Sequence, residues 1–211
     1  MGSRIDAPVK IVSDACLPLI TLLKAVQSGW EPPTTLSEED YGWLKAINDP
    51  YDPMTAFAGF GCSFAGKWFG GYARCNRGDN YAKNSSSSLR KQFGRNYAMN
   101  ARNGLLKHKN DGVVFCCADY RALVPQDALI YCDPPYAGTT GYNAVGKFDW
   151  EEFWDTMRVW SLTGNTVFIS EYAAPEDFVC VLEIPTNTEI RTKAGREPRI
   201  ERLFRLKDCL E

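Results

Sequence analysis

Short apolar runs recur along the chain, separated by longer segments in which apolar residues return at helical spacing. A continuous apolar run of a few residues, bounded by polar or turn-forming residues, favours a buried strand. Four runs of this form predict strands: VKIVSDA (9–15), GVVFCCADY (112–120), ALIYCDPPY (128–136) and TVFISEY (166–172).

The segments between these runs have apolar residues at helical spacing and predict four helices: 17–30, 37–47, 88–109 and 148–165. The first and the last contain Gly29 and Gly164 near their ends, and glycine favours the left-handed turn that follows a helix. The second begins at Ser37, a good N-cap residue, with Asp40 three positions later in a pattern similar to a capping box.

The alternation of strands and helices predicts an α/β fold with a largely parallel sheet. Two further segments, 177–190 and 199–208, predict a terminal strand pair around a basic turn. In open sheets of this kind, ligands bind beside the carboxyl ends of the strands. Four acids fall near the predicted strand ends, so we expect one crevice to gather them: Asp14, Asp119, Asp133 and Glu171.

Residues 49–88 break this pattern because they are rich in glycine, aromatic residues and serine and have no clear period. Their many aromatic residues indicate an irregular insertion or a small subdomain and not a linker. Ten Lys and Arg and a single acid, Asp79, lie between Lys67 and Lys109, although the net charge of the whole chain is −2. Such a basic segment favours a polyanionic partner. A solvated loop without a partner is the alternative.

Composition narrows the class of protein. The 211 residues, of which 45% are hydrophobic, suit a single domain spanning 1–211 with an insertion. No apolar run approaches the roughly 18 residues that cross a bilayer, and the first residues lack the apolar core of a signal peptide, so we expect no membrane partner. The eight cysteines are irregularly spaced and there is one histidine, which favours reduced thiols in the cytoplasm over disulfides or a zinc site.

The sequence Asp133-Pro134-Pro135-Tyr136 follows the third predicted strand directly and carries the clearest chemistry. The exocyclic amine of a nucleobase is a poor nucleophile because its lone pair is delocalised into the ring. An enzyme that methylates this amine must accept hydrogen bonds from its N–H groups. Asp133 can accept one, and the carbonyl of Pro134, held by the proline rings, can accept the other. Tyr136 offers a flat face for a base flipped out of a duplex. The alternative is a turn that only ends the strand.

Together, YCDPPY (131–136) and GFGCSFAGKWFGGYARCNRGDNY (59–81) resemble a DNA adenine-N6 methyltransferase of the Dam type, in a form common in phages. The resemblance runs from about Ile11 to Phe204. It implies a Rossmann-like methyltransferase sheet, S-adenosylmethionine as methyl donor and double-stranded DNA as substrate, in the cytoplasm of a bacterial or phage-infected cell. RNA and protein amides are other substrates for the same kind of pocket.

The resemblance also assigns residues. The family's catalytic motif is matched by Asp133, Pro134, Pro135 and Tyr136, with Asp133 also facing the cofactor. Asp119 matches the acid that contacts the adenine amine of the cofactor, and Tyr120 would pack beside that ring. Asp14 matches the acid that holds the ribose hydroxyls, and a carboxylate at a strand end is well suited to a diol. Cys16 stands where most relatives have Asn.

Residues 52–103 resemble the inserted, DNA-facing segment of the family. Four of its basic residues would contact phosphates, which positions DNA without reading its sequence: Lys67, Arg74, Arg77 and Lys83. Four of its aromatic residues would either stack on bases or form a small hydrophobic core: Phe64, Trp68, Phe69 and Tyr72.

One element of the family pattern is missing. The family normally begins with a glycine-rich strand-turn-helix of the type FxGxG, and its strand lies between those that carry Asp14 and Asp133. Thirteen residues precede Asp14 and none forms such a loop, while FAGFG at 57–61 has the spelling but no strand leading into it. Three explanations stay open: a split or truncated enzyme completed by a partner chain or an N-terminal segment, a gap filled by another strand, or a non-catalytic DNA-binding remnant.

Overall fold

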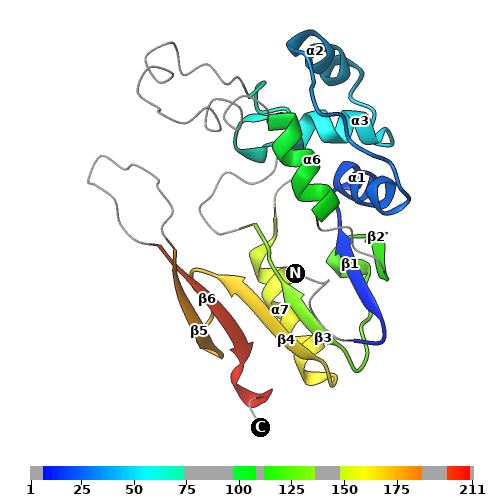
Figure 1. The fold of residues 1–211 in the computed structure, drawn as a ribbon. Helices are drawn as coiled ribbons and strands as arrows, with labels where there is room; N and C mark the ends of the chain where they lie inside the picture. The colour runs from blue at the N-terminus through cyan, green and yellow to red at the C-terminus, as the bar shows by residue number, and fades with distance from the viewer. Residues whose placement is uncertain (1–6, 74–96, 108–111, 136–147, 187–198, 210–211) are drawn as a thin grey trace, which may run out of the picture. The chain divides into compact units, whose positions relative to one another are not determined.

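The computed structural model describes residues 7–73, 97–107, 112–135, 148–186 and 199–209. The fold is mixed α/β, with helices and two sheets, one parallel and one mixed (Figure 1). The chain divides into two compact units, Met1–Ala122 and Leu123–Glu211. The α/β class predicted from the sequence is therefore confirmed, and each unit is described below in turn.

The first unit contains a two-stranded parallel sheet. Strand β1 (Lys10–Asp14) pairs with β2 (Val113–Cys117), so that Lys10 lies opposite Val113 and Asp14 opposite Cys117. Parallel strands need a long crossover, and here α1 (Leu17–Gln27) begins that crossover and packs on the pair. The buried side chains at this contact come from both elements: Ile20, Val113 and Phe115.

The predicted helix signals of the first unit are confirmed. Helix α1 ends at Gln27, and Gly29 follows with a φ of 98°, a left-handed conformation that favours glycine. Helix α2 (Glu38–Ile47) begins after Ser37, whose hydroxyl oxygen accepts the backbone N–H of Asp40 at 2.9 Å. The Ser37 hydroxyl in turn donates to the Asp40 carboxylate at 2.6 Å. Ser37 and Asp40 therefore bond to each other in both directions, as the two residues of a capping box do.

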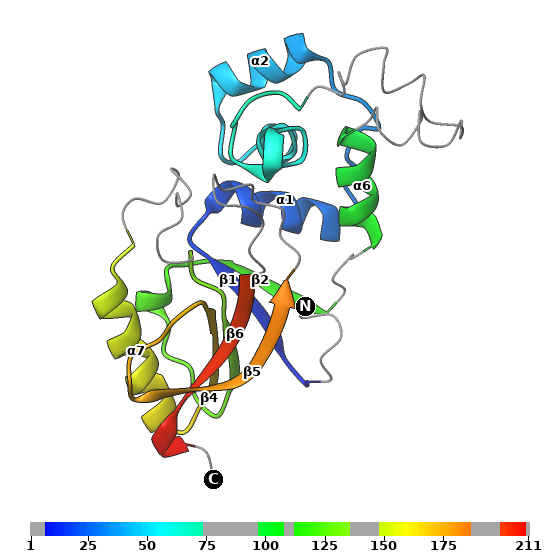
Figure 2. The same cartoon turned by 90° about the vertical axis from the view of Figure 1, so that its left-hand side faces the viewer.

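Residues 53–66 are more regular than the sequence predicts. They form α3 (Pro53–Ala56), the π-helical turn η2 (Phe57–Gly61) and the 3-10 turn η3 (Phe64–Gly66). The expectation of irregular backbone is wrong here, because the Asp52 carboxylate caps α3 by accepting the N–H groups of Met54 and Thr55. The helices α1 and α2 pack on opposite sides of this segment and stabilise its turns (Figure 2).

A hydrophobic core joins these turns to their neighbours. Helix α6 (Tyr97–Lys107) covers η2, and its predicted extension over 88–96 lies outside the described residues. The core is built mainly from buried side chains of α1, α2, α3 and η2: Leu22, Val26, Tyr41, Leu44, Ala56, Phe57 and Ala58. The Trp68 indole packs directly on Gly59, where an added Cβ would lie 2.4 Å from a ring carbon. Gly59 is therefore needed for this close approach and not for a flexible loop.

The second unit is a four-stranded mixed sheet with one helix. Strands β3 (Leu129–Cys132), β4 (Thr166–Glu171), β6 (Arg199–Leu206) and β5 (Phe178–Thr186) lie in that order. Strands β3 and β4 are parallel, whereas β6 is antiparallel to both of its neighbours. Helix α7 (Trp150–Leu162) covers one face of the sheet (Figures 1 and 2) and buries Met157 completely.

The terminal strand pair predicted from the sequence is confirmed as β5 and β6, while its basic turn lies outside the described residues. The pair makes this sheet mixed, so among the described strands the expectation of a largely parallel sheet holds only for β1–β2 and β3–β4. Among the described strands, β1 pairs only with β2 and β3 only with β4. Each of these parallel strands therefore has one edge without a described partner.

Within the described residues, no helix is long and apolar enough to cross a membrane. Each cysteine in this part of the chain is a free thiol. Cys62 is buried and Cys132 is half-buried, and burial raises the pKa of Cys62 to about 11 and that of Cys132 to about 12.

Candidate functional site

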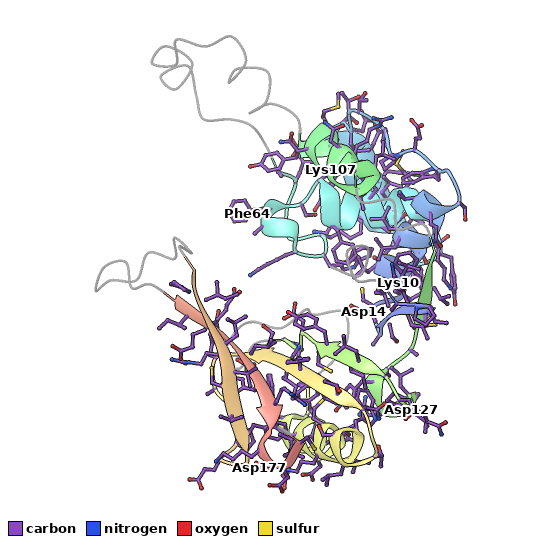
Figure 3. All side chains as sticks on the ribbon, turned by 60° about the horizontal axis from the view of Figure 1, so that its bottom comes forward. Lys10, Asp14, Phe64, Lys107, Asp127 and Asp177 are labelled. Carbon is purple, nitrogen blue, oxygen red and sulfur yellow. The ribbon has the colours of Figure 1, made fainter. Side chains whose placement is uncertain are left out.

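Asp14 ends strand β1 and leads directly into α1 (Figure 3). One carboxylate oxygen, Oδ1, accepts the backbone N–H of Cys16 at 2.7 Å, which fixes the side chain in an Asx turn. Within the described part of the chain, no group donates to the other oxygen, Oδ2. Asp14 thus keeps acceptor capacity for hydroxyl donors, which fits the predicted contact with a ribose diol.

Asp119 lies two residues beyond strand β2, at the start of the 3-10 turn η4 (Tyr120–Ala122). Arg121 holds its carboxylate in a fork: Nε lies 2.8 Å from Oδ1 and Nη2 lies 2.7 Å from Oδ2. The backbone N–H of Arg121 also donates to Oδ1 at 3.0 Å. Chiefly through the side-chain hydrogen bond from Arg121, the pKa of Asp119 is lowered. Arg121 was not among the residues predicted from the sequence, where its position two residues after Asp119 was the only available signal.

The structure brings Asp14 and Asp119 to the same edge of the first sheet. Asp14 is opposite Cys117, and its backbone carbonyl accepts the N–H of Ala118 at 3.2 Å. The Ser13 hydroxyl donates to the carbonyl of Ala118 at 3.0 Å, which ties the two strand ends together. Both acids therefore lie at the carboxyl ends of parallel strands, where α/β sheets bind ligands.

The residues of the proposed catalytic motif lie in the second unit. Strand β3 ends at Cys132, and Asp133, Pro134 and Pro135 follow in irregular backbone. The Asp133 residue is exposed and Pro134 is buried, so the turn is packed into the unit while its acid faces outward. Tyr136 lies outside the described residues. The Cys132 thiol, 3.4 Å from the sulfur of Met157, anchors the end of the strand against α7.

Other groups lie near Asp133 at the ends of β3 and β4. The pKa of Tyr131 is raised, first by burial and then by the charge of Asp133, while a hydrogen bond with Ser170 acts in the opposite direction. Glu171 is 1% exposed and accepts the N–H of Tyr172 at 2.6 Å. The four strand-end acids thus fall in both units, Asp14 and Asp119 in the first, Asp133 and Glu171 in the second. A single crevice for all four stays a prediction.

Of the four basic residues predicted to contact DNA, the structure describes Lys67. Lys67 is exposed and follows η3, while Arg74, Arg77 and Lys83 lie outside the described residues. The backbone around Lys67 is held by hydrogen bonds, because its N–H donates to the carbonyl of Phe64 at 3.3 Å and its carbonyl accepts the N–H of Gly70 at 2.9 Å. Its ammonium group is thus carried on an ordered loop.

Most of the predicted stacking aromatics belong to the core of the first unit. Phe69 is buried, Trp68 and Tyr72 are packed beside it, and the Tyr72 hydroxyl donates to the carbonyl of Leu36 at 2.6 Å. Phe64 is the exception, with 68% of its surface exposed on a ring that projects from η3 (Figure 3). Of these four residues, only Phe64 is therefore available to a base.

The segment FAGFG (57–61) does not have the strand-turn-helix form of the family's cofactor loop. It forms η2, follows helix α3 and not a strand, and buries Phe57, Ala58 and Gly59. This agrees with the interpretation that its spelling alone does not make it the cofactor loop. No glycine-rich strand-turn-helix occurs in the described ranges. These ranges also contain no group of three or more His, Cys, Asp or Glu placed to hold a metal ion.

A scan against protein-family models and a search of curated proteins found no match to this chain.

Proposed function

We propose that the chain is a DNA adenine-N6 methyltransferase that uses S-adenosylmethionine. The observation that carries the proposal is the Asp133-Pro134-Pro135 turn, which follows a parallel strand directly and combines an exposed acid with a buried proline. A simple strand end does not require a carboxylate that faces outward beside a rigid, packed backbone. An acceptor for a flipped base must be reachable from outside and held in place, and this arrangement supports both.

In the proposed reaction, Asp133 accepts a hydrogen bond from the N6 amine of adenine, and the carbonyl of Pro134 accepts the second. These contacts turn the nitrogen lone pair out of conjugation with the ring. Asp133 also takes up the proton that the amine loses. Tyr136 stacks on the base. S-adenosylmethionine supplies an electrophilic methyl group when bound, and no side chain of the protein needs to form a covalent bond.

The first unit offers groups that fit the cofactor. Asp14 has an oxygen that receives no donor from the described residues, which suits the ribose hydroxyls, and Asp119 and Tyr120 follow the neighbouring strand. These roles come from the family resemblance, and the strand-end geometry of both acids supports them.

The finer fold that we propose is a Rossmann-like methyltransferase sheet without its glycine-rich strand. In the family, this strand is flanked by the two that carry the equivalents of Asp14 and Asp133. Strands β1 and β3, which lead to these two acids, each have an edge without a described partner, which supports the proposal.

Double-stranded DNA is the proposed substrate. The basic segment from Lys67 to Lys109, which holds ten Lys and Arg and one acid, supports a polyanionic partner. Lys67 on its ordered loop and the exposed Phe64 are the described residues that we assign to this contact. Phe64 would stack on or wedge between bases, as apolar side chains do in proteins that distort DNA.

The replacement Asp133→Ala tests the proposal. We expect transfer of a tritiated methyl group to mixed-sequence duplex DNA to fall by about 10²- to 10⁴-fold, because the amine loses its acceptor. Binding of duplex DNA, measured by fluorescence anisotropy, stays unchanged. Asp208→Ala is the matched control, because Asp208 is an exposed acid of the same unit. No transfer by the wild-type chain to DNA, RNA or protein would refute the proposal.

The second candidate function is a non-catalytic DNA-binding remnant, or one half of a split enzyme. It is favoured by one observation, the absence of a glycine-rich strand-turn-helix from the described residues. Calorimetry separates the candidates. Saturable binding of S-adenosylmethionine by the chain alone rules out a remnant that has lost its cofactor, whereas DNA binding without cofactor binding or transfer supports it.

A further inference from the structure

Asp119, Tyr120 and Arg121 form a compact group that we call the Asp119 clamp. The Arg121 guanidinium grips both carboxylate oxygens of Asp119, at 2.8 Å and 2.7 Å. Its central carbon also lies 5.8 Å from the centroid of the Tyr120 ring, within the range of a cation–π contact. One cation therefore contacts both residues that are assigned to the adenine end of the cofactor.

The clamp limits what Asp119 can still accept. An ionised carboxylate has about four acceptor positions, two on each oxygen. Oδ1 receives two donors, the backbone N–H and Nε of Arg121, so its positions are filled. Oδ2 receives Nη2 alone within the described residues, which leaves one acceptor position. The side chain also cannot turn freely, because a fork of two parallel hydrogen bonds fixes the plane of the carboxylate.

We propose that Arg121 is a positioning residue that makes the cofactor site specific for a 6-amino purine. The inference rests on the proposed function. The single acceptor left on Oδ2 matches one N–H of an exocyclic amine. A 6-oxo purine such as hypoxanthine would place a carbonyl oxygen against this oxygen, where it finds no donor and meets like charge. The clamp thus selects adenine over its deaminated counterpart.

Folding alone gives little reason for the clamp. The side chains of Arg121 and Asp119 are 52% and 32% exposed, and ion pairs this exposed contribute little to stability. The turn has its own backbone hydrogen bond, from the N–H of Ala122 to the carbonyl of Asp119 at 3.0 Å. The turn should therefore persist when Arg121 is replaced, and only the orientation of the carboxylate should change.

The test is direct binding by calorimetry of S-adenosylhomocysteine and of S-inosylhomocysteine, which has oxygen in place of the 6-amino group. We expect the wild-type chain to prefer the adenine compound by about 10- to 150-fold, the range of one hydrogen bond to a charged group. Arg121→Ala should abolish most of this preference. Arg121→Lys should keep only part of it, because an ammonium cannot form the fork.

Lys24→Ala is the control, because it removes an exposed positive charge from the same unit outside the basic segment, and it should keep the full preference. An Arg121→Ala variant that binds both compounds with the wild-type ratio would overturn the inference while the proposed function stands. A wild-type chain that binds the adenine compound without preference would also overturn the inference alone. A wild-type chain that binds neither compound would overturn both the inference and the proposed function. Circular dichroism of each variant shows that it is folded.

Discussion

Asn165 gives the sharpest test of how the second unit holds strand β3, which leads to Asp133. The residue is 5% exposed and lies just before β4. Its Oδ1 accepts the N–H of Ala128 at 3.0 Å, and its Nδ2 donates to the carbonyls of Pro125 at 3.1 Å and Trp160 at 3.0 Å. One carboxamide thus links the end of α7 to the segment that enters β3, and its contact with Ala128 lies five residues before Asp133.

The replacement Asn165→Ala removes all three hydrogen bonds. A typical intramolecular hydrogen bond contributes about 0.5–1.5 kcal/mol net, so the loss should be about 1.5–4.5 kcal/mol, and we take about 3 kcal/mol. The N–H of Ala128 would lose this acceptor, which favours the upper half of that range. Because 1.4 kcal/mol corresponds to a factor of ten, amides that exchange through unfolding of this unit should exchange about 100-fold faster.

Hydrogen exchange followed by mass spectrometry measures this effect in peptides from β3 and β4, with peptides from β1 and β2 as the internal reference. Asn103→Ala is the matched control, because Asn103 is exposed on α6 and should change nothing. If exchange in β3 and β4 quickens less than about threefold, the carboxamide does not hold the strands and the reasoning is wrong.

Asn165→Asp separates the acceptor from the donors. The new carboxylate would still accept the N–H of Ala128, but its second oxygen would face the carbonyls of Pro125 and Trp160. Burial and this repulsion raise the pKa of the new carboxyl above its unfolded value. The variant should therefore be most stable relative to Asn165→Ala at low pH, where the protonated acid donates, and lose that advantage as the pH rises through the raised pKa.

Two further predictions concern packing. Gly59→Ala should destabilise the first unit by about 1–3 kcal/mol in urea unfolding, because the new Cβ would lie 2.4 Å from an indole carbon, whereas Gly42→Ala, with nothing within 4 Å, should not destabilise it. Iodoacetamide at neutral pH should label the exposed Cys117 first, because burial raises the pKa of Cys62 to about 11 and that of Cys132 to about 12. Equal labelling of all three native thiols, detected by mass spectrometry, would contradict this.

The sequence predicts those elements whose signals are local. Ser37 with Asp40, Gly29, and the apolar runs at 112–120 and 166–172 each act through neighbouring residues, and the structure confirms them. The acids after strands could be placed for the same reason, because a strand end fixes where the next residues lie.

The rest depends on contacts that a sequence does not display. The helical turn at 57–61 forms because its residues are buried among helices from distant segments, which overrides the weak propensity of glycine. Gly59 suggests a loop, yet its role is to admit the Trp68 ring. The only signal for Arg121 in the sequence was its position two residues after Asp119, and an arginine near an acid in sequence can equally point into solvent. Only coordinates show its fork on Asp119.

The pairing of β1 with β2 has a consequence for synthesis on the ribosome. The hydrogen bond between Ser13 and Ala118 joins residues 105 positions apart. At about 5–20 residues per second, β1 waits about 5–20 s for its partner strand to be made, whereas helices form in microseconds. During that interval the strand that leads to Asp14 emerges with bare edges, a state prone to aggregation. The speed of translation between residues 14 and 119, and not chain diffusion, therefore sets when the strand ends that carry Asp14 and Asp119 come together.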